Sequence, residues 1–279
     1  MIIQEALAFG RQQLTHSSNP TLDARLLLEF VLGKSHSYLA AYREQPLSPN
    51  QEESYQQLIQ RAAQAEPIPY LTGQAPFFGR LFRVTPAVLI PRPETEQLVE
   101  RALKWGAAHP QPVVIDVGTG SGCIAITLAL SLPAATIEAT DISEAALVVA
   151  RQNAASYQVA GRISFHQGNL LEPVVHTPNL IAANLPYITD EEWPSLPDGV
   201  KSYEPESALR GGPDGLDYFR QLLSQAKEKM SPGGAIFLEI GWKQGSAVKQ
   251  LGQSFFPDAQ VDLLADYAGK DRIVTITGH

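Results

Sequence analysis

Apolar side chains in the first 73 residues recur at the spacing of amphipathic helices. One series lies between Asn19-Pro20, a capping residue followed by a proline that suits the first helical turn, and Gly33, which suits a helix end. Its members are Leu22, Leu26, Leu27, Phe30 and Val31. A capping box at Ser48–Gln51 predicts a second helix that runs to about Ala65. The pattern predicts a small helical bundle over residues 1–73, which we expect to be a recognition module without chemistry of its own.

The pattern then changes to short strands and afterwards to alternating helices and strands. Phe77 to Ile90 is typical of a β-hairpin, and Pro91–Glu94 of a stiff connector, so we assign residues 74–93 to a hairpin and linker. Beyond it, strands are predicted at 113–117, 135–140, 163–166, 179–183, 235–239 and 272–277, and helices at 95–104, 121–132, 143–156 and 216–230. This alternation predicts an α/β domain over residues 94–279, with a mostly parallel sheet covered on both faces.

Composition places the chain among ordinary globular proteins. The hydrophobic fraction is 44% and the charged fraction 18%, and no apolar stretch is long enough to span a bilayer. A single cysteine excludes an internal disulfide framework and is compatible with a reducing compartment. The N-terminal residues lack the basic region and cleavage site of a secretion signal. We therefore expect a cytoplasmic protein that does not associate with membranes.

The net charge of −8 is unevenly distributed. Residues 1–90 carry 7 Lys/Arg and 7 Asp/Glu, whereas residues 94–279 carry 13 Lys/Arg and 22 Asp/Glu. Nucleic-acid binding draws much of its affinity from basic surface that neutralises phosphates. An acidic α/β domain is poorly suited to hold naked RNA or DNA, so a protein partner or a small substrate is favoured.

A glycine-rich loop, Gly118-Thr119-Gly120-Ser121-Gly122, joins the first strand of the α/β domain to its helix. Such a loop allows a ligand to approach the backbone closely at a helix N-terminus. Its spacing differs from the dinucleotide fingerprint, and Asp116 precedes it. Asp141, at the end of the second strand, stands where an acidic residue commonly binds ribose hydroxyls. These features favour S-adenosylmethionine, whose sulfonium tolerates an acidic rim, over a nicotinamide cofactor. Cys123 is expected to pack as a small residue.

The stretch Asn184-Leu185-Pro186-Tyr187 follows the buried fourth strand of this domain. It combines an amide, a rigid turn and an aromatic ring at a strand end, where ligands bind in open α/β sheets. A side-chain oxygen of Asn184 and the carbonyl of Leu185 are each suited to accept one amide N–H, while Tyr187 is suited to pack against a planar group. The stretch therefore predicts a site for a planar amide or amine that receives a methyl group.

Several further stretches, spread over the chain, resemble one branch of the nitrogen methyltransferases. They are Asp23–Leu28, Pro69–Gly73, Leu89–Glu96, Tyr203–Pro205, Glu239–Gly241 with Gly245, and Asp266-Tyr267 with Asp271-Arg272. Together with the glycine loop and Asn184–Tyr187, this set resembles the HemK/PrmC family, the protein-(glutamine-N5) methyltransferases of peptide chain release factors. The run Ile90-Pro-Arg-Pro-Glu-Thr-Glu96 is the most specific of these motifs.

The resemblance implies a class I S-adenosylmethionine-dependent methyltransferase with a Rossmann-like sheet, a smaller N-terminal helical domain and a hairpin linker. It implies methylation of the glutamine in the Gly-Gly-Gln motif of class-1 release factors by a monomer that does not bind nucleic acid directly. Asn184, Pro186 and Tyr187 would be catalytic, and with Leu185 they would bind the substrate. The cofactor would contact Gly118–Gly122, Asp141, Asn169 and Asn184. We expect no obligatory general base, because the amide proton can leave after the nitrogen becomes cationic.

One departure from the family pattern leaves alternatives open. Leu185 stands where the family has a proline, and Asn-Leu-Pro-Tyr also resembles the motif of ribosomal RNA adenine dimethyltransferases. An adenine-N6 methyltransferase acting on RNA or DNA is therefore the alternative, followed by a non-catalytic or nicotinamide-binding Rossmann protein. The six histidines, at positions 16, 36, 109, 166, 176 and 279, have no metal-ligand spacing, so we expect no metal.

Overall fold

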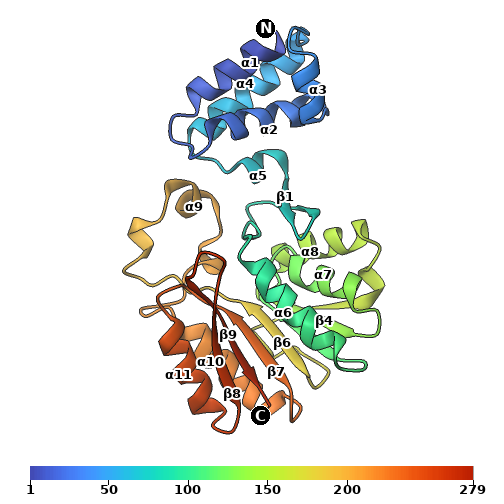
Figure 1. Ribbon diagram of the computed structural model, residues 1–279, viewed down its shortest axis with the longest axis vertical. Helices are drawn as coiled ribbons and strands as arrows, with labels where there is room; N and C mark the ends of the chain where they lie inside the picture. The colour runs from blue at the N-terminus through green and yellow to red at the C-terminus, as the bar shows by residue number, and fades with distance from the viewer. Residues whose placement is uncertain (279) are drawn as a thin grey trace. The chain divides into compact units, whose positions relative to one another are not determined.

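The computed structural model describes residues 1–278, which divide into two compact units (Figure 1). The first unit contains Met1–Gln74 together with Pro197–Tyr203. The second contains Ala75–Leu196 and the chain from Glu204 onward. A short segment that lies far along the sequence therefore belongs to the N-terminal helical unit. Within that unit, the Tyr203 hydroxyl donates to the Gln64 carbonyl at 3.2 Å.

The first unit is helical, as the apolar spacing predicts. Its helices are α1 (Ile3–Gln13), α2 (Pro20–Leu32), α3 (His36–Ala41), α4 (Pro49–Ala63), α5 (Ile68–Thr72) and α9 (Asp198–Tyr203). The Asn19 side chain caps α2, and Gly33 ends it with a φ of 60°. Ser48 and Gln51 form the predicted capping box of α4. That helix ends two residues before Ala65, whose φ of 65° is incompatible with a continuing helix.

A close helix contact organises the core of this unit. A side chain at Gly10 of α1 would lie 2.2 Å from the Tyr55 hydroxyl oxygen, so the position requires glycine. Tyr55 is fully buried in α4, and its hydroxyl donates to the Ala24 carbonyl of α2 at 3.2 Å. The hydrogen bond satisfies the one polar atom of a large buried side chain. Helices α1, α2 and α4 are thereby held in contact, with Leu27 and Ile59 buried between them.

The hairpin belongs to the second unit and lies earlier in the sequence than predicted. Its strands are β1 (Gln74–Phe77) and β2 (Arg80–Arg83), joined through Phe78 and Gly79, which have φ values of 50° and 71°. Positive φ at both central residues matches the twist of a tight hairpin. The hairpin ends at Arg83 and does not continue to Ile90 as predicted, because the Asn153 side chain takes both backbone groups of Arg83, at 2.8 and 3.0 Å.

Within the described residues, a seven-stranded sheet forms the centre of the second unit, in the order β5-β4-β3-β6-β7-β9-β8. The strands are β3 (Val113–Val117), β4 (Thr136–Asp141), β5 (Ile163–Gln167), β6 (Leu180–Asn184), β7 (Ala235–Glu239), β8 (Gln260–Ala265) and β9 (Asp271–Thr277). The first five in this order are parallel, and β9 is antiparallel to both of its neighbours, β7 and β8. All six predicted strands are confirmed; β8 is not among the predicted elements.

Helices cover both faces of the sheet (Figure 1). One apolar cluster joins the sheet to α6 (Thr95–Ala107), α7 (Cys123–Ser131) and α8 (Glu144–Ser156). The other joins it to α10 (Asp217–Lys229) and α11 (Gly245–Phe255). Within the second unit, helix α11, like β8, is missing from the prediction. Short 3-10 turns at Ala160–Arg162, Trp193–Ser195 and Glu206–Ala208 complete the unit. In the described part of the chain, no helix is long and apolar enough to cross a bilayer.

A buried carboxylate fixes the loop before β6 to the sheet. Glu138 of β4 accepts hydrogen bonds from the backbone N–H groups of Val175 and His176, at 3.0 and 2.9 Å. Its oxygens also lie 2.9 Å from the His166 ring and 2.6 Å from the His176 ring. Burial favours the neutral acid, but the hydrogen bonds and the imidazoles outweigh it and hold the pKa of Glu138 below its ordinary value.

We expect Glu138→Gln to lower the free energy of unfolding by about 1–3 kcal/mol at neutral pH, because one amide oxygen cannot replace two carboxylate oxygens. The pKa of Glu138 is lower in the folded state than its unfolded value of about 4.3, so the ionised side chain stabilises the fold above that pH. This stabilisation is lost as pH falls through the folded-state pKa. The difference between variant and wild type should therefore narrow below about pH 4. Urea unfolding across this range measures it, and a constant difference would contradict the assignment.

Candidate active site

A pocket opens at the carboxyl edge of the parallel sheet, where the strand order reverses between β3 and β6. This reversal is the topological switch point at which open α/β sheets bind ligands. The lining residues lie at the ends of four strands, in the linker before α6, at the starts of α6, α7 and α8, and in two later segments. They are 118–121, 140–143 with 146, 168–170, 184–186, 87–92 without 90, 95, 123–124, 205, 207–208 and 218. The predicted glycine loop and the predicted Asn184 stretch thus face one cavity.

Asp116 braces the glycine loop from inside the protein. Its Oδ2 accepts hydrogen bonds from the Thr119 hydroxyl at 2.6 Å and from the Ala125 N–H at 3.0 Å. The side chain is fully buried, does not line the pocket, and its burial raises the pKa of Asp116 to about 7. Asp116, which precedes the loop in the sequence, lies beneath it in the structure and ties β3 to α7.

The three glycines of the loop all have positive φ values, which are 72°, 54° and 81° for Gly118, Gly120 and Gly122. Only glycine adopts such angles without strain. Gly122 does not line the pocket. A Cβ there would lie 3.0 Å from Ile126 and 3.1 Å from Ala150, so this glycine allows the start of α7 to pack against α8. Gly118, Thr119, Gly120 and Ser121 face the cavity.

Asp141 connects the glycine loop to the start of α8. One of its carboxylate oxygens accepts the Gly120 N–H at 2.9 Å, and the other accepts the Ser143 N–H at 2.9 Å. Burial raises the pKa of Asp141, while these two N–H groups oppose the rise. Asn169, after the neighbouring strand β5, also lines the pocket, and its side-chain amide donates to Glu172 at 3.1 Å. Asp141 is the only acidic residue among those that line the pocket.

The Asn184 stretch contributes three residues to the cavity wall. The Asn184 side chain donates through Nδ2 to the Thr95 hydroxyl at the start of α6, at 3.1 Å. Leu185 is buried, and its Cδ2 would lie 3.3 Å from a Cβ at Gly118. The tetrapeptide and the glycine loop are therefore in direct contact. Pro186 lines the same wall.

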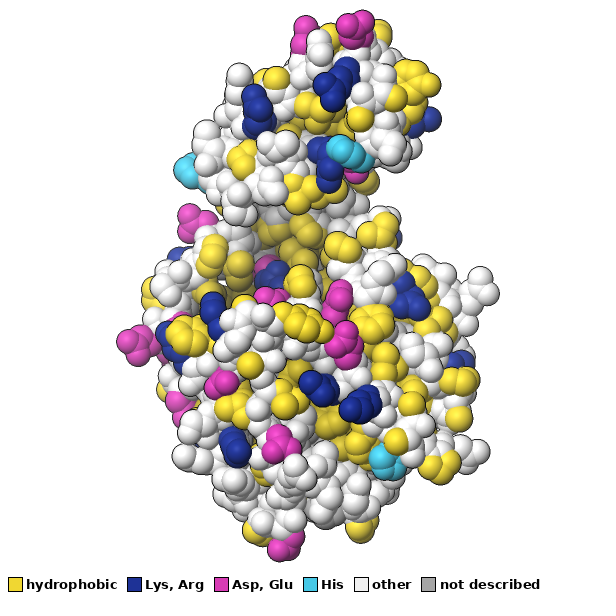
Figure 2. Space-filling view, in the orientation of Figure 1, with side chains coloured by type: hydrophobic (Ala, Val, Ile, Leu, Met, Phe, Trp, Pro, Cys, Tyr) yellow, Lys and Arg dark blue, Asp and Glu magenta, His cyan; other side chains and the backbone are white. Residues whose placement is uncertain are grey.

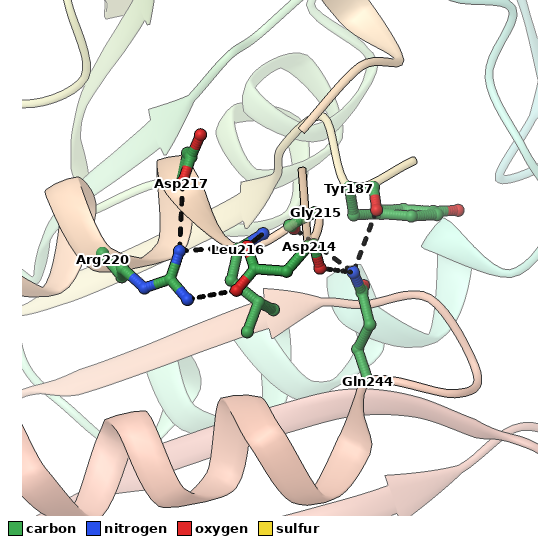
Figure 3. A network of polar contacts seen from close by, with 7 residues as sticks. All are labelled: Tyr187, Asp214, Gly215, Leu216, Asp217, Arg220 and Gln244. Atoms are coloured by element: carbon green, nitrogen blue, oxygen red, sulfur yellow. Dashed lines mark hydrogen bonds and ion pairs between the residues drawn. The ribbon is translucent and has the colours of Figure 1, made fainter. Parts of the chain in front are cut away.

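Tyr187 lies outside the set of residues that line the pocket. Its backbone carbonyl accepts a hydrogen bond from Gln244 Nε2 at 2.9 Å (Figure 3). The same amide group donates to the Gly215 carbonyl at 3.2 Å, and its oxygen accepts the Gly241 N–H at 3.0 Å. Burial raises the pKa of Tyr187 to about 12. Gln244 therefore fixes the loop after β6 to the loops before α10 and after β7.

Arg92 and Glu204 form an ion pair that the sequence does not reveal. Arg92 Nη2 donates to Glu204 at 2.5 Å, and the other carboxylate oxygen accepts the Ile90 N–H at 3.1 Å. The Glu204 side chain is buried although it lies in a loop segment between α9 and the 3-10 turn at Glu206–Ala208. Arg92 is the only Lys or Arg that lines the pocket within residues 1–278.

The chain matches two family models and a set of full-length relatives. Residues 5–73 match the PrmC N-terminal domain, and residues 97–194 match the methyltransferase small domain. The release factor glutamine methyltransferase of Moorella thermoacetica is 42% identical over 98% of this chain and 97% of its own length. The Bacillus subtilis protein of the same name is 37% identical over 99% of this chain and 98% of its own length.

The chain belongs to the release factor glutamine methyltransferase family. This confirms the resemblance on which the sequence analysis relied.

Solved structures confirm the class I methyltransferase fold of the second unit. A methyltransferase from Pyrococcus furiosus superimposes with a TM-score of 0.55 at 18% identity, over 72% of this chain and 90% of that one. The catalytic domain of human Mettl16, solved with an RNA hairpin, gives a TM-score of 0.56 at 13% identity, over 71% and 75%. At these identities the likeness concerns the fold alone. No group of three His, Cys, Asp or Glu side chains is arranged to hold a metal within the described residues, outside which His279 lies.

The contacts of Gln244 give a testable expectation for the loop after β6. Replacing Gln244 by alanine removes the partners of the Tyr187 carbonyl and the Gly241 N–H. We expect the free energy of unfolding to fall by about 1–3 kcal/mol, because buried backbone groups lose their partners. The Gly241 amide should exchange hydrogen faster, whereas Gln244→Glu, which keeps an acceptor for it, should preserve its protection. Gln260→Ala, at an exposed glutamine, is the matched control; unchanged Gly241 exchange in Gln244→Ala would contradict the role.

Proposed function

We propose that this protein transfers a methyl group from S-adenosylmethionine to the side-chain amide nitrogen, N5, of the glutamine in the Gly-Gly-Gln motif of class-1 peptide chain release factors. The observation that carries the proposal is that the glycine loop and the Asn184 stretch line one cavity and contact each other through Leu185 and Gly118. Membership in the release factor glutamine methyltransferase family, over nearly the full length of the chain, supports the same substrate.

The cavity suits S-adenosylmethionine. Asp141 lies at the end of β4, where its carboxylate is suited to accept ribose hydroxyls, and Gly118–Gly120 admit a close approach to the backbone. Asn169 and Leu170 form the wall assigned to the adenine. When bound, S-adenosylmethionine supplies an activated methyl group on a sulfonium centre. Gly122 does not line the cavity, but it allows the start of α7 to pack against α8 and so fixes the end of the glycine loop.

The Asn184 stretch is suited to orient the substrate glutamine. An amide nitrogen is a weak nucleophile because its lone pair is delocalised into the carbonyl. The Asn184 side-chain oxygen and the Leu185 carbonyl each accept one amide N–H, which directs the nitrogen at the methyl group. Pro186 restricts the turn, and Tyr187 packs against the amide plane when the substrate is bound. Positioning of this kind contributes several kcal/mol to catalysis, at about 7 or more in favourable cases. No general base is assigned, because the proton leaves a cationic nitrogen.

The domains divide recognition and chemistry in this proposal. The helical domain, residues 1–73, recognises the release factor; residues 74–93 link it to the methyltransferase domain, residues 94–279. The acidic charge of that domain favours a protein substrate over nucleic acid. We expect a monomer that acts in the cytoplasm, where release factors work on ribosomes.

Transfer of labelled methyl from S-adenosylmethionine to a purified release factor tests the substrate. Label should appear on the wild-type factor and be absent from a factor whose Gly-Gly-Gln motif is changed to Gly-Gly-Ala. RNA serves as the control substrate and should remain unlabelled. Label on RNA would instead favour adenine-N6 methylation, and label that persists on the Gly-Gly-Ala factor would exclude the glutamine as the acceptor.

Asn184→Ala tests the assignment of the amide-binding residue. Loss of one oriented acceptor should lower kcat by about 100-fold, since small misplacements of reacting groups have effects of that size. Affinity for S-adenosylmethionine, measured by calorimetry, should change little, because the glycine loop and Asp141 are untouched. Asp141→Ala is the converse variant and should weaken cofactor binding. Full activity of Asn184→Ala would refute its role.

A further inference from the structure

A groove in the helical unit has no part in the chemistry proposed above. Its lining residues belong to α1, α2 and α3 or lie directly beside these helices. Four of them carry cationic or imidazole side chains, namely Arg11, Arg25, His36 and Arg43. We call this feature the arginine groove.

The basic residues of this part of the chain are concentrated at the arginine groove. Residues 1–74 contain five Lys/Arg and seven Asp/Glu. Three of the five basic residues line the groove, and none of the seven acidic residues does. Lys and Arg side chains gather beside a histidine on the visible face of the helical unit (Figure 2). The groove is therefore a positive site within a stretch whose formal charge is negative.

Two of the arginines are not neutralised by the protein itself. The side chains of Arg11 and Arg43 are exposed, and neither makes a hydrogen bond or an ion pair within the described residues. Arg61 of the same unit, in contrast, donates to Glu66 at 2.8 Å. The backbone carbonyl of Arg43 accepts the Gln4 N–H at 3.0 Å, which fixes this residue beside the start of α1. The groove thus presents two free guanidinium groups, one of them on an anchored backbone.

Arg25 and His36 add further hydrogen-bond donors. Arg25 Nη1 lies 3.1 Å from His36 Nδ1. A guanidinium only donates, so Nδ1 accepts and the ring proton of His36 is on Nε2. Arg25 Nε also lies 3.3 Å from Glu29, which partly offsets its charge and holds the guanidinium in place. His36 Nε2 has no partner among residues 1–278. Every cationic or imidazole group of the groove therefore has a donor for an anionic partner.

Apolar side chains line the same groove. Leu22 of α2 is 36% exposed, and Leu7 of α1 also contributes. No Phe, Tyr or Trp is among the described residues that line it. Proteins that hold single-stranded nucleic acid commonly stack bases on such rings, and the net charge of −8 is unfavourable for phosphates. Carboxylates accompanied by apolar side chains match the groove better than a nucleic-acid backbone does.

We propose that the arginine groove binds an acidic segment of the release factor, whose carboxylates pair with Arg11 and Arg43 and whose apolar side chains pack on Leu22. This inference rests on the proposed function and specifies how the helical unit recognises its substrate. Charge pairs of this kind act mainly on association and are screened by salt. The cavity assigned to S-adenosylmethionine is lined only by residues of the second unit, so the groove contributes to binding of the release factor and not to the chemical step.

Charge reversal in the full chain tests the electrostatic part. The double variant Arg11→Glu/Arg43→Glu should raise the KM for the release factor by about 10-fold or more, because two attractive contacts become repulsive. The kcat at saturating release factor and the affinity for S-adenosylmethionine should stay at the wild-type values. Added NaCl should raise the KM of wild type more than that of the double variant. Lys34→Glu is the matched control, since Lys34 is exposed in the same unit but does not line the groove.

A second pair of variants tests the apolar part. Leu22→Gln should raise the same KM by about threefold or more, because a leucine buried by the release factor is replaced by a polar side chain. Phe30→Gln should leave the KM unchanged, since Phe30 is an exposed apolar residue of the same helix that lies outside the groove. Thermal unfolding of each variant reports any loss of folding.

Hydrogen exchange of the release factor, with and without this protein, locates the segment that is bound. Protection should include an acidic stretch, and changing its Asp and Glu residues to Lys should restore a low KM with the Arg11→Glu/Arg43→Glu variant. Failure of every such reversal to restore it would overturn the pairing.

The inference is also overturned if the double variant, folded as wild type, keeps the wild-type KM. Two findings alongside that unchanged KM would identify another occupant. A wild-type dimer that the substitutions dissociate, seen by analytical ultracentrifugation, would indicate a second copy of the chain, and labelled RNA bound by wild type alone would indicate nucleic acid. Absence of methyl transfer by wild type would overturn the proposed function instead. Calorimetric binding of the release factor, which needs no turnover, separates that failure from failure of the groove.

Discussion

The pairing of β3 with β6 is the constraint on which the site depends. The two strands are parallel and in register, with Val117 opposite Ala183. Strand β3 ends at Val117 and β6 one residue after Ala183, so Gly118 and Asn184 lie side by side. A Cβ at Gly118 would lie at an ordinary van der Waals distance, 3.8 Å, from the Asn184 carbonyl oxygen, so the two strand ends are close neighbours. Residues 66 positions apart in the sequence therefore meet at one edge of the sheet. The pairing of β3 with β4 and of β6 with β7 brings Asp141 and Glu239 to the same edge.

Buried carboxylates recur on the strands of this sheet, and each has a different balance of burial against hydrogen bonding. Asp116 accepts two hydrogen bonds through one oxygen and leaves Oδ1 without a partner. Glu138, whose oxygens are both engaged, has a lowered pKa, whereas burial raises that of Glu239 to about 7. Full hydrogen bonding does not exclude a carboxylate from the pocket, because Asp141, whose two oxygens each accept an N–H, lines it. Asp116, under the glycine loop, and Glu239, behind Asn184, each have one oxygen without a hydrogen-bond partner. Such buried groups lower the stability of the fold, a cost that proteins accept at functional sites.

Local patterns were sufficient to predict most of the second unit. Strand β3, the loop Gly118–Gly122 and the helix after it carry strong signals, because a buried apolar strand and a turn that requires glycine leave few alternatives. Strand β8 was missed because its burial does not alternate: only Val261 is fully buried. Helix α11 has glycine at position 245 and again at 252, where it packs against Ile276, so its composition favours a loop.

Long-range partners could not be predicted in the same way. The ion pair of Arg92 with Glu204 joins residues 112 positions apart, and nothing beside either residue indicates the other. The Thr95 contact with Asn184 spans 89 positions, and that of Gln244 with Tyr187 spans 57. Family motifs did include Thr95, Glu204 and Glu239, but a motif gives no partner. Only the register of the sheet and the placement of α6 show which of these residues meet.

Leu185 shows how a departure from the family pattern can be accommodated by packing. A proline at this position would restrict the backbone by fixing its own φ. In this protein the leucine side chain is 3% exposed and belongs to the apolar cluster that includes Val117, Ile181 and Leu238. The end of the branched leucine side chain lies against Gly118 and so connects Asn184–Tyr187 to the glycine loop. Burial of a leucine contributes about 1.5–3 kcal/mol, which is enough to hold one backbone conformation at the strand end. The carbonyl of residue 185, which the proposed mechanism uses, is retained with either residue.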